Sequence, residues 1–488
     1  MEAFSDMKTP AFVLDSHQVD VCLKKMVKAD GGNTRADKQT RSYYKEADYA
    51  LLWVDGMGVD ERADSLLAWL HLLNEIGMSE QAFGVGEIEQ DLKRIRTLDL
   101  DEGKNSMSQV AARLDYRLTK ACLRYCYGQR FGFINPYHVF NNLDAEKTDS
   151  VKGVIKYSGL FDMKMDMPDK DYAAKVFGKI RNDSIAAYLR EIQPKDRFYG
   201  QLRMMLASAP TADQRKRIMV NMERCRWRSH QPMVETGKRI IVNIPAYHLY
   251  AYSDEDQLDM RVVCGNKKTK TPLLSSYIEW MEINPQWVIP MSIIENDVAR
   301  RAGDSSYFAR NRYHIYERAT NKKMPIHSVT KQMLLSGKYR VAQEGGAGNS
   351  LGRIVFRFKN NFSVFLHDTS NPGAFERQSR DVSHGCVRVS KPFDLAQFVL
   401  DDPDEWLVDR IRIAMGIPAE TVRGIDYERD HPETEGRNKL IGYVPVKPRV
   451  PLYIIYYTQW PDVSGMLQTW PDVYGYDEVV WDNLKPYL

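Results

Sequence analysis

Apolar residues in the first part of the chain recur three and four positions apart, which is the spacing of one face of an α-helix. Asp60 is a candidate N-cap and Gly77 a candidate stop for one such striped segment. Residues 108–128 show the same helical spacing of apolar residues, and Gly128 is the candidate stop. The pattern predicts a helical domain over residues 1–230, in which the helices bury their stripes against one another.

From about residue 236 the hydrophobic pattern changes to a period of two. Residues 238–253 and 353–368 alternate between apolar and polar positions and are rich in β-branched and aromatic side chains, as strands are. The second segment predicts a hairpin, because residues 359–361, Lys-Asn-Asn, can form its turn. A sheet-based domain is therefore expected over residues 231–488.

One long stretch of the second domain breaks this alternation. Residues 295–340 are polar and rich in arginine, which predicts a mostly helical or loop insertion that caps the sheet as a lid. Strand-like character returns in a closing strand region at about residues 445–488. The expected fold class is α+β, with a helical N-terminal domain followed by a β-rich domain that carries the capping insertion.

The composition is that of globular domains, with 43% hydrophobic and 27% charged residues. Lys and Arg number 68 against 65 Asp and Glu, so the charge does not favour nucleic acid or an anionic membrane surface as a partner. No stretch approaches the roughly 20 apolar residues of a membrane span, and the N-terminal residues lack the pattern of an export signal. We therefore expect no nucleic-acid partner and no transmembrane segment.

The six cysteines are spread along the chain, without the dense spacing of a disulfide scaffold or the paired spacing of a zinc site. The glycine-rich residues 344–352 lack the spacing of a phosphate-binding loop and are expected to form a turn before the hairpin. The sequence therefore predicts no metal and no cofactor.

Residues 383–388, Ser-His-Gly-Cys-Val-Arg, place a thiol two residues after an imidazole. A cysteine nucleophile reacts as its thiolate, and with an ordinary pKa of about 8.5 it needs a base. We favour His367, because it ends a predicted buried strand and can approach the Cys386 sulfur from a neighbouring strand. His384 is tied to the same tight turn as Cys386, so it is better suited to orienting the backbone or contacting a substrate.

The residues around Cys386 have predicted roles of their own. Gly385 allows the turn φ values that a side chain would forbid, and the amides around Gly385 and Cys386 are the expected oxyanion hole. Arg388 is a fixed cation that suits either a substrate carboxylate or a structural carbonyl. A lone cysteine or histidine in such a segment is usually part of the core, so the hypothesis depends on their combination.

The sequence Leu-His-Asp-Thr at residues 366–369, followed by Ser-His-Gly-Cys-Val-Arg at residues 383–388, resembles the core motif of the L,D-transpeptidases of bacterial peptidoglycan. Other segments that are similar to the same catalytic domain are residues 242–252, 284–293 and 348–358. Residues 114–136 resemble the scaffold domain of the larger subgroup of this family. The resemblance extends from about residue 60 to the end of the chain.

The resemblance implies a cysteine acyltransferase. Cys386 would attack the carbonyl that joins the third residue of a tetrapeptide stem, commonly diaminopimelate, to a terminal D-Ala. After D-Ala leaves, an amine of a second stem would take the acyl group and form a 3-3 cross-link, with His367 as the base. The residues carried over from the family as substrate-binding are Ser383, Arg388, Trp287, Asp368 and Thr369. The family also implies carbapenem-type inhibitors and a location in the periplasm or cell envelope.

The chain departs from the family pattern in one region that bears on substrate binding. Residues 199–218 leave no room for the separate peptidoglycan-binding module that often lies between scaffold and catalytic domain. Two alternatives share the motif, namely an L,D-carboxypeptidase that hydrolyses the same thioester and a non-catalytic protein that binds or scaffolds the cell wall. A papain-like protease fits less well, because its cysteine precedes its histidine in the chain.

Overall fold

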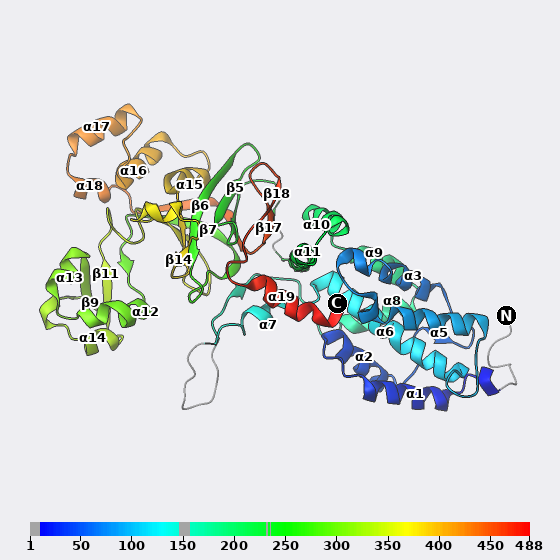
Figure 1. Cartoon of the computed structure of the whole chain (residues 1–488). Helices are drawn as coiled ribbons and strands as arrows, with labels where there is room; N and C mark the ends of the chain where they lie inside the picture. Colours follow the sequence, from blue (N-terminus) through cyan, green and yellow to red (C-terminus); the bar gives the residue numbers. More distant parts are fainter. Residues whose placement is uncertain (1–9, 146–156, 231–232, 235) are drawn as a thin grey trace. The chain divides into compact units, whose positions relative to one another are not determined.

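The computed structural model describes residues 10–145, 157–230, 233–234 and 236–488, and it separates into two compact units (Figure 1). The first unit consists of residues 1–144, 164–232 and 475–488, and the second of residues 145–163 and 233–474. We had expected one division at residue 230. The structure differs, because the strand β3 (Phe161–Asp162) pairs with β7 (Leu273–Ile283) and the last helix, α19 (Tyr476–Leu484), contacts α11 (Ala212–Arg226).

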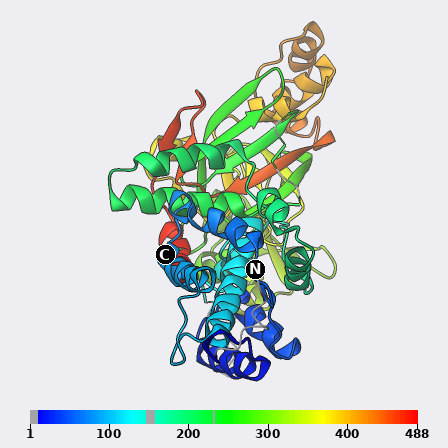
Figure 2. The ribbon, with the colours of Figure 1, turned by 90° about the vertical axis from the view of Figure 1, so that its right-hand side faces the viewer.

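The first unit is helical, as the period of its apolar residues predicts. Its longest helix, α6 (Met107–Phe131), runs through the middle of the bundle in Figures 1 and 2. The other helices of this unit are α1 (Ser16–Ala29), α2 (Arg35–Glu46), α3 (Glu61–Leu70), α4 (Glu80–Phe83), α5 (Val85–Thr97), α7 (Pro136–Phe140), α8 (Tyr172–Arg181), α9 (Ile185–Glu191), α10 (Arg197–Ser208), α11 and α19. A two-stranded sheet joins β1 (Val54–Asp55) to β2 (Gly58–Val59). Helices α1, α2, α3, α5, α8 and α11 all contact α6, so this helix organises the core.

The predicted helix signals have mixed outcomes. Asp60 is the N-cap of α3 and accepts a hydrogen bond from the amide of Arg62, and Gly77 has the left-handed backbone of a helix stop. Gly128, however, does not end α6, which continues to Phe131. A Cβ at Gly128 would lie 2.0 Å from the ring of Phe133, so this glycine allows close packing inside the helix rather than stopping it.

The second unit contains a ten-stranded sheet whose main path runs β12-β13-β15-β6-β5-β4-β16-β7-β3. Because β12 also pairs with β7, the path closes on itself. Its strands are β4 (Arg239–Asn243), β5 (His248–Tyr252), β6 (Gln257–Gly265), β7, β12 (Ile354–Phe358), β13 (Leu366–His367), β14 (Asp381–Ser383), β15 (Val387–Val389), β16 (Tyr443–Ile455) and β3. The predicted hairpin is confirmed, since β12 and β13 pair antiparallel with Val355 opposite His367. The closing strand β16 lies between β4 and β7.

The capping insertion at residues 295–340 is mostly helix and loop, as predicted. It also contributes to a separate antiparallel sheet of four strands in the order β10-β9-β11-β8. These strands are β8 (Trp287–Val288), β9 (Tyr313–Glu317), β10 (Lys323–Met324) and β11 (Tyr339–Gln343). Short helices accompany them at α12 (Met291–Ile293), α13 (Ser305–Arg310) and α14 (Lys331–Leu335). Ile315 and Val341 of these strands and Phe308 of α13 lie together in a small apolar core.

The remaining elements of the second unit are four helices and a hairpin that come after β15 in the chain. They are α15 (Pro392–Val399), α16 (Glu405–Met415), α17 (Val422–Asp430), α18 (Thr434–Asn438) and a hairpin of β17 (Gln459–Pro461) with β18 (Leu467–Thr469). Across the residues that the structure describes, none of the helices has the length and apolar character needed to cross a membrane.

Candidate active site

The strands β12, β13 and β15 place the predicted catalytic residues on one face of the sheet. His367 lies opposite Val355 on β12 and opposite Arg388 on β15. Paired residues project to the same face, so His367 and Arg388 share one face. Leu366 and Val387 form the next pair and project to the opposite face, where both are completely buried.

Cys386 immediately precedes β15. Continuing the same register by one residue sets Cys386 opposite Phe365, and the amide of Val387 donates to the carbonyl of Phe365 at 3.0 Å. Alternation then puts the Cys386 side chain on the face of His367 and Arg388. Although nineteen residues separate Cys386 from His367 in the sequence, the parallel pairing makes them diagonal neighbours.

His367 is held as a neutral imidazole. It is 4% exposed, and burial lowers its pKa to about 4, with the charges of Arg388 and Arg357 acting in the same direction. Its Nδ1 lies at hydrogen-bond distance from the backbone carbonyl of Asp368, which can only accept. Nδ1 therefore carries the hydrogen of the neutral ring and Nε2 is the basic nitrogen.

The pKa of the Cys386 thiol is shifted upward, whereas that of His367 is shifted downward. Burial raises its pKa, while the backbone of Phe365 and the charges of Arg357 and Arg388 oppose this rise without cancelling it. A thiol with a raised pKa is protonated at neutral pH. Because a protonated thiol is a poor nucleophile, Cys386 needs a base, and His367 is in its basic form over the whole neutral range.

Two guanidinium groups influence both Cys386 and His367. Arg388 is half-buried, and its Nε has no hydrogen-bond partner within the described part of the chain. Arg357, on β12, pairs with Glu282 at 2.8 Å and lies 4.2 Å above the ring of Phe365, and its buried Nε also has no partner there. The two guanidinium groups therefore place positive charge beside the thiol and the imidazole.

The turn before Cys386 is held by internal hydrogen bonds. The Ser383 hydroxyl donates to the Cys386 carbonyl at 2.6 Å and accepts from the amide of Gly385 at 3.2 Å. Gly385 has φ +111°, and its carbonyl accepts from the hydroxyl of Thr271 at 2.8 Å. The Gly385 amide and the Ser383 hydroxyl thus bond to one another in this structure, and their expected roles in an oxyanion hole and in substrate binding stay predictions.

The amide of Cys386 differs from that of Gly385. It makes no hydrogen bond to any residue that the structure describes, so it is the candidate oxyanion donor of this turn. His384 is exposed at the tip of the turn, and its ring likewise has no hydrogen-bond partner among those residues. It is therefore accessible to a ligand.

Asp368 and Thr369, which we expect to bind substrate, both make hydrogen bonds to the backbone. The Asp368 carboxylate accepts hydrogen bonds from the amides of Arg353 at 2.8 Å and Thr369 at 2.7 Å. The Thr369 hydroxyl accepts from the amide of Asn371 at 3.1 Å. Both side chains therefore position the segment that follows His367, and their role in substrate binding stays a prediction.

Trp287 lies in the small sheet of the capping insertion. It pairs with Gln343 on β11 and packs against the apolar core that contains Ile289 and Ile315. The structure therefore brings it into a different sheet from Cys386. No group of three His, Cys, Asp or Glu side chains that could hold a metal ion occurs among the described residues.

Sequence analysis missed two contributors to this site. Arg357 is two residues after Val355 on an alternating strand, so the period of β12 could have placed it on the face of His367. The backbone carbonyl of Asp368 left no trace in the pattern of side chains. It could be found only from the coordinates.

Comparisons with known proteins agree with this geometry. Residues 237–413 match the family model of the L,D-transpeptidase catalytic domain, and residues 38–206 match that of a scaffold domain. A protein of Haemophilus influenzae that is provisionally named an L,D-transpeptidase is 26% identical over 333 residues, which cover 66% of this chain and 62% of that protein. The Cys386 turn and the His367 strand lie inside the first match. Residues 237–413 are thus an L,D-transpeptidase catalytic domain, and residues 38–206 are a scaffold domain.

Proposed function

We propose that the protein is a peptidoglycan L,D-transpeptidase in which Cys386 is the nucleophile and His367 the base. The observation that carries this proposal is the placement of the two side chains as diagonal neighbours on one face of the sheet, with the imidazole neutral and the thiol protonated. A neutral imidazole beside a protonated thiol is the state from which one proton transfer creates the nucleophile.

The proposed reaction has two acyl transfers. In the first, Nε2 of His367 takes the thiol proton as the Cys386 sulfur attacks the carbonyl between the third stem residue, diaminopimelate or a similar residue, and D-Ala. The imidazolium returns the proton to the departing D-Ala amine, and a thioester remains. In the second, the side-chain amine of another stem attacks the thioester, His367 takes the amine proton, and the proton passes to the released Cys386 sulfur.

The other residues of the site have supporting roles in this proposal. The Cys386 amide stabilises the oxyanion of each tetrahedral intermediate, which for one such donor is typically worth about 3 kcal/mol. Arg388 and Arg357 attract a carboxylate of the donor stem through their positive charge. Ser383 and Gly385 shape the turn, Asp368 and Thr369 position His367, and the exposed His384 contacts the substrate.

The capping insertion and the location of the reaction are also part of the proposal. The small sheet that contains Trp287 has an apolar core of its own, so it can move as a body and act as a lid over the donor stem. The reaction belongs to the periplasm or cell envelope, where its peptidoglycan substrate lies. Carbapenem-type compounds, which carry a reactive acyl group, are expected to acylate Cys386.

Intact-mass analysis after incubation with purified disaccharide-tetrapeptide tests the function. The expected result is a mass increase by the acyl group, release of D-Ala and formation of cross-linked dimers. Cys386→Ala is expected to give none of these. D-Ala release without dimers would instead indicate an L,D-carboxypeptidase. Absence of both the adduct and D-Ala release in the wild type would indicate a non-catalytic wall protein and contradict the proposal.

A further inference from the structure

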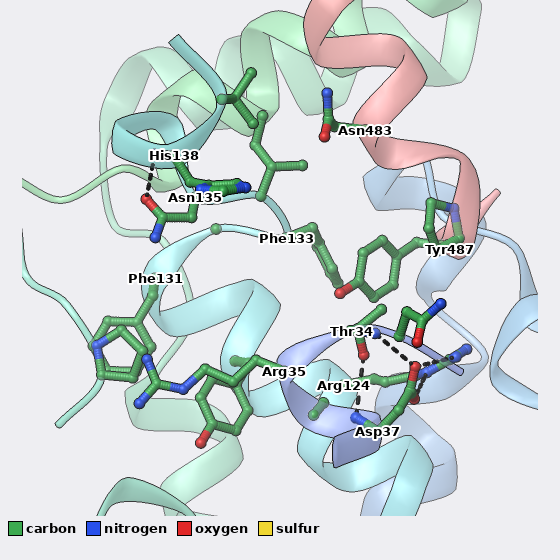
Figure 3. Close-up of a pocket in the computed structure, with 18 of the residues that line it drawn as sticks. Thr34, Arg35, Asp37, Arg124, Phe131, Phe133, Asn135, His138, Asn483 and Tyr487 are labelled. Carbon is green, nitrogen blue, oxygen red and sulfur yellow. Dashed lines mark hydrogen bonds and ion pairs between the residues drawn. The ribbon is translucent and has the colours of Figure 1, made fainter. Parts of the chain in front are cut away.

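A pocket of about 520 Å³ lies entirely within the helical first unit (Figure 3). Its walls are the start of α2, the last turns of α6, the α7 segment and the residues around the end of α19. Small-molecule sites typically enclose about 300–1,000 Å³, so the pocket has room for a ligand the size of a disaccharide. The proposed acyl transfer uses none of its residues.

Aromatic rings form a large part of this pocket. Phe133 and Tyr487 have ring centres 4.8 Å apart, and Figure 3 shows the two rings between the helix start at Thr34 and the end that carries Asn483. Tyr127 extends this aromatic wall and, like Phe133 and Tyr487, is less than 9% exposed, so the half-buried Phe131 is the ring most open to a ligand. Flat apolar surfaces of this kind pack well against the C–H faces of pyranose rings.

Three side-chain amides line the pocket and keep unused hydrogen-bonding atoms. Asn135 uses its oxygen to cap α7 at the amide of His138, which leaves its nitrogen free. Asn483 uses its nitrogen at the carbonyl of Val479, which leaves its oxygen free. Asn33 makes no side-chain hydrogen bond to any described residue. Among the described residues these donors and acceptors have no partner, and they match sugar hydroxyls and acetamido groups, which both donate and accept.

The charges in the pocket argue for an uncharged ligand. Its acidic residue, Asp37, is held by the guanidinium of Arg124 at 2.7 and 3.0 Å and by the capping box with Thr34, so it is not available to bind a cation. Arg35 donates to the carbonyl of Asp169 at 3.0 Å and lies 5.6 Å above the ring of Tyr127. A single exposed arginine is too little to bind a polyanion, but it can donate to hydroxyl and carbonyl oxygens.

We propose that this pocket is a carbohydrate-binding site that takes N-acetylated amino sugars of the peptidoglycan glycan strand. The aromatic rings pack against the sugar rings, and the amides of Asn33, Asn135 and Asn483 bind the hydroxyl and acetamido groups. Binding of this kind anchors the enzyme on its polymer, and the choice of ligand rests on the proposed function. The proposal concerns binding by the first unit, and its test does not depend on the acyl-transfer chemistry.

The test is isothermal titration of the full-length protein with glycan strands from which an amidase has removed the peptide stems. Such strands carry no acyl donor, so Cys386 cannot turn them over. The double variant Asn33→Ala, Asn483→Ala is expected to raise the Kd at least about tenfold, which corresponds to about 1.4 kcal/mol. Asn182→Ala is the matched control, because this asparagine is also exposed in the first unit but lies outside the pocket, and it should keep the wild-type Kd.

Phe131→Ala provides an independent variant and is also expected to weaken binding, with folding checked by its thermal melting curve. No heat of binding with millimolar stem-free strands would overturn the proposal, and so would equal Kd values for the double variant and the wild type. Displacement of the strands by free tetrapeptide would overturn it as well, because the pocket would then bind the stem. Cys386→Ala should bind the strands like the wild type, which separates this result from any failure of the proposed reaction.

Discussion

The backbone carbonyl of Asp368 accepts a hydrogen bond from Nδ1 of His367, the residue that directly precedes it, while the carboxylate of the same aspartate accepts from the amide of Arg353. One residue thus fixes the tautomer of the imidazole with its main chain and joins the His367 strand to the turn before β12 with its side chain. A base held in this way presents Nε2 in a defined direction, which is what proton transfer from a neighbouring thiol requires.

Replacing the two histidines separately tests which one is the base. His367→Ala is expected to lower the rate of Cys386 acylation by about 10²–10⁴-fold, the usual range for loss of a general base. His384→Ala is expected to lower it by less than about tenfold, because this exposed side chain bonds to none of the described groups. Single-turnover acylation followed by mass spectrometry measures both rates. Equal losses in the two variants would contradict the assignment of His367.

The reactivity of Cys386 should increase at alkaline pH. Burial raises the pKa of the thiol, so the thiolate fraction is small at neutral pH and grows as pH rises above the ordinary value. Alkylation of Cys386 by iodoacetamide, followed by peptide mass spectrometry, should therefore accelerate up to and beyond pH 9. Arg388→Gln removes a nearby cation and should move this profile to still higher pH. A rate that is already constant below pH 7 would show a preformed thiolate and refute this expectation.

Acid should destabilise the second unit through His367. Its folded pKa is about 4, whereas an unfolded histidine has a pKa of about 6.5, so below pH 6.5 the unfolded chain binds the proton more readily. The stabilisation is thus present above pH 6.5 and is lost as the pH falls toward 4. Urea unfolding at pH 7.5 and 4.5 should show a larger drop in midpoint for the wild type than for His367→Gln. The same drop in both proteins would indicate that other groups dominate.

Arg357 should affect substrate binding more than the chemical step. Arg357→Gln removes a positive charge near Cys386 and His367, and we expect about a tenfold higher KM for tetrapeptide stems with a free carboxylate. The KM for stems in which this carboxylate is amidated should change little. Arg449→Gln is the control, since this exposed arginine pairs with Glu279 at 2.9 Å on the same sheet. Equal effects on both kinds of stem would exclude a carboxylate contact.

Two glycine-to-alanine variants, one in α6 and one in α8, test how tightly the helices of the first unit are packed. Gly128→Ala places a Cβ 2.0 Å from the ring of Phe133, and overpacking of this kind typically costs about 1–3 kcal/mol. Gly178→Ala, in the middle of α8, meets no atom within 4 Å and should stabilise the protein by about 0.5–1 kcal/mol. Thermal unfolding should therefore move in opposite directions for the two variants. A Tm of Gly128→Ala equal to the wild type would show that Phe133 moves without cost.

The periodicity of apolar residues predicted the two kinds of structure because it reports which face of an element is buried. It placed the helices of the first unit and the β12–β13 hairpin, and with them the buried end of the strand at His367. It missed β9, because in a small sheet only one face is covered and the other residues look like a polar loop. It also gave Gly128 the wrong role, since the ring of Phe133 that requires a glycine is a tertiary contact.

Only the part of the site chemistry that depends on side-chain identity could be predicted from the sequence. The motif around Cys386 indicated a nucleophile and a base, and the register of β13 and β15 then brings them together. Which atoms of the turn are already occupied depends on geometry, so the sequence could not reveal that the Ser383 hydroxyl takes the amide of Gly385. Backbone groups such as the Asp368 carbonyl have the same composition at every position and leave no signal.

The position of β16 between β4 and β7 has a consequence for biosynthesis. The ribosome makes the His367 strand and the Cys386 turn before residue 443. Until β16 follows, β4 and β7 lack the strand that pairs with both of them. The catalytic unit is therefore expected to complete its folding late in translation, and a nascent chain arrested before residue 443 should expose two strand edges that are prone to aggregation.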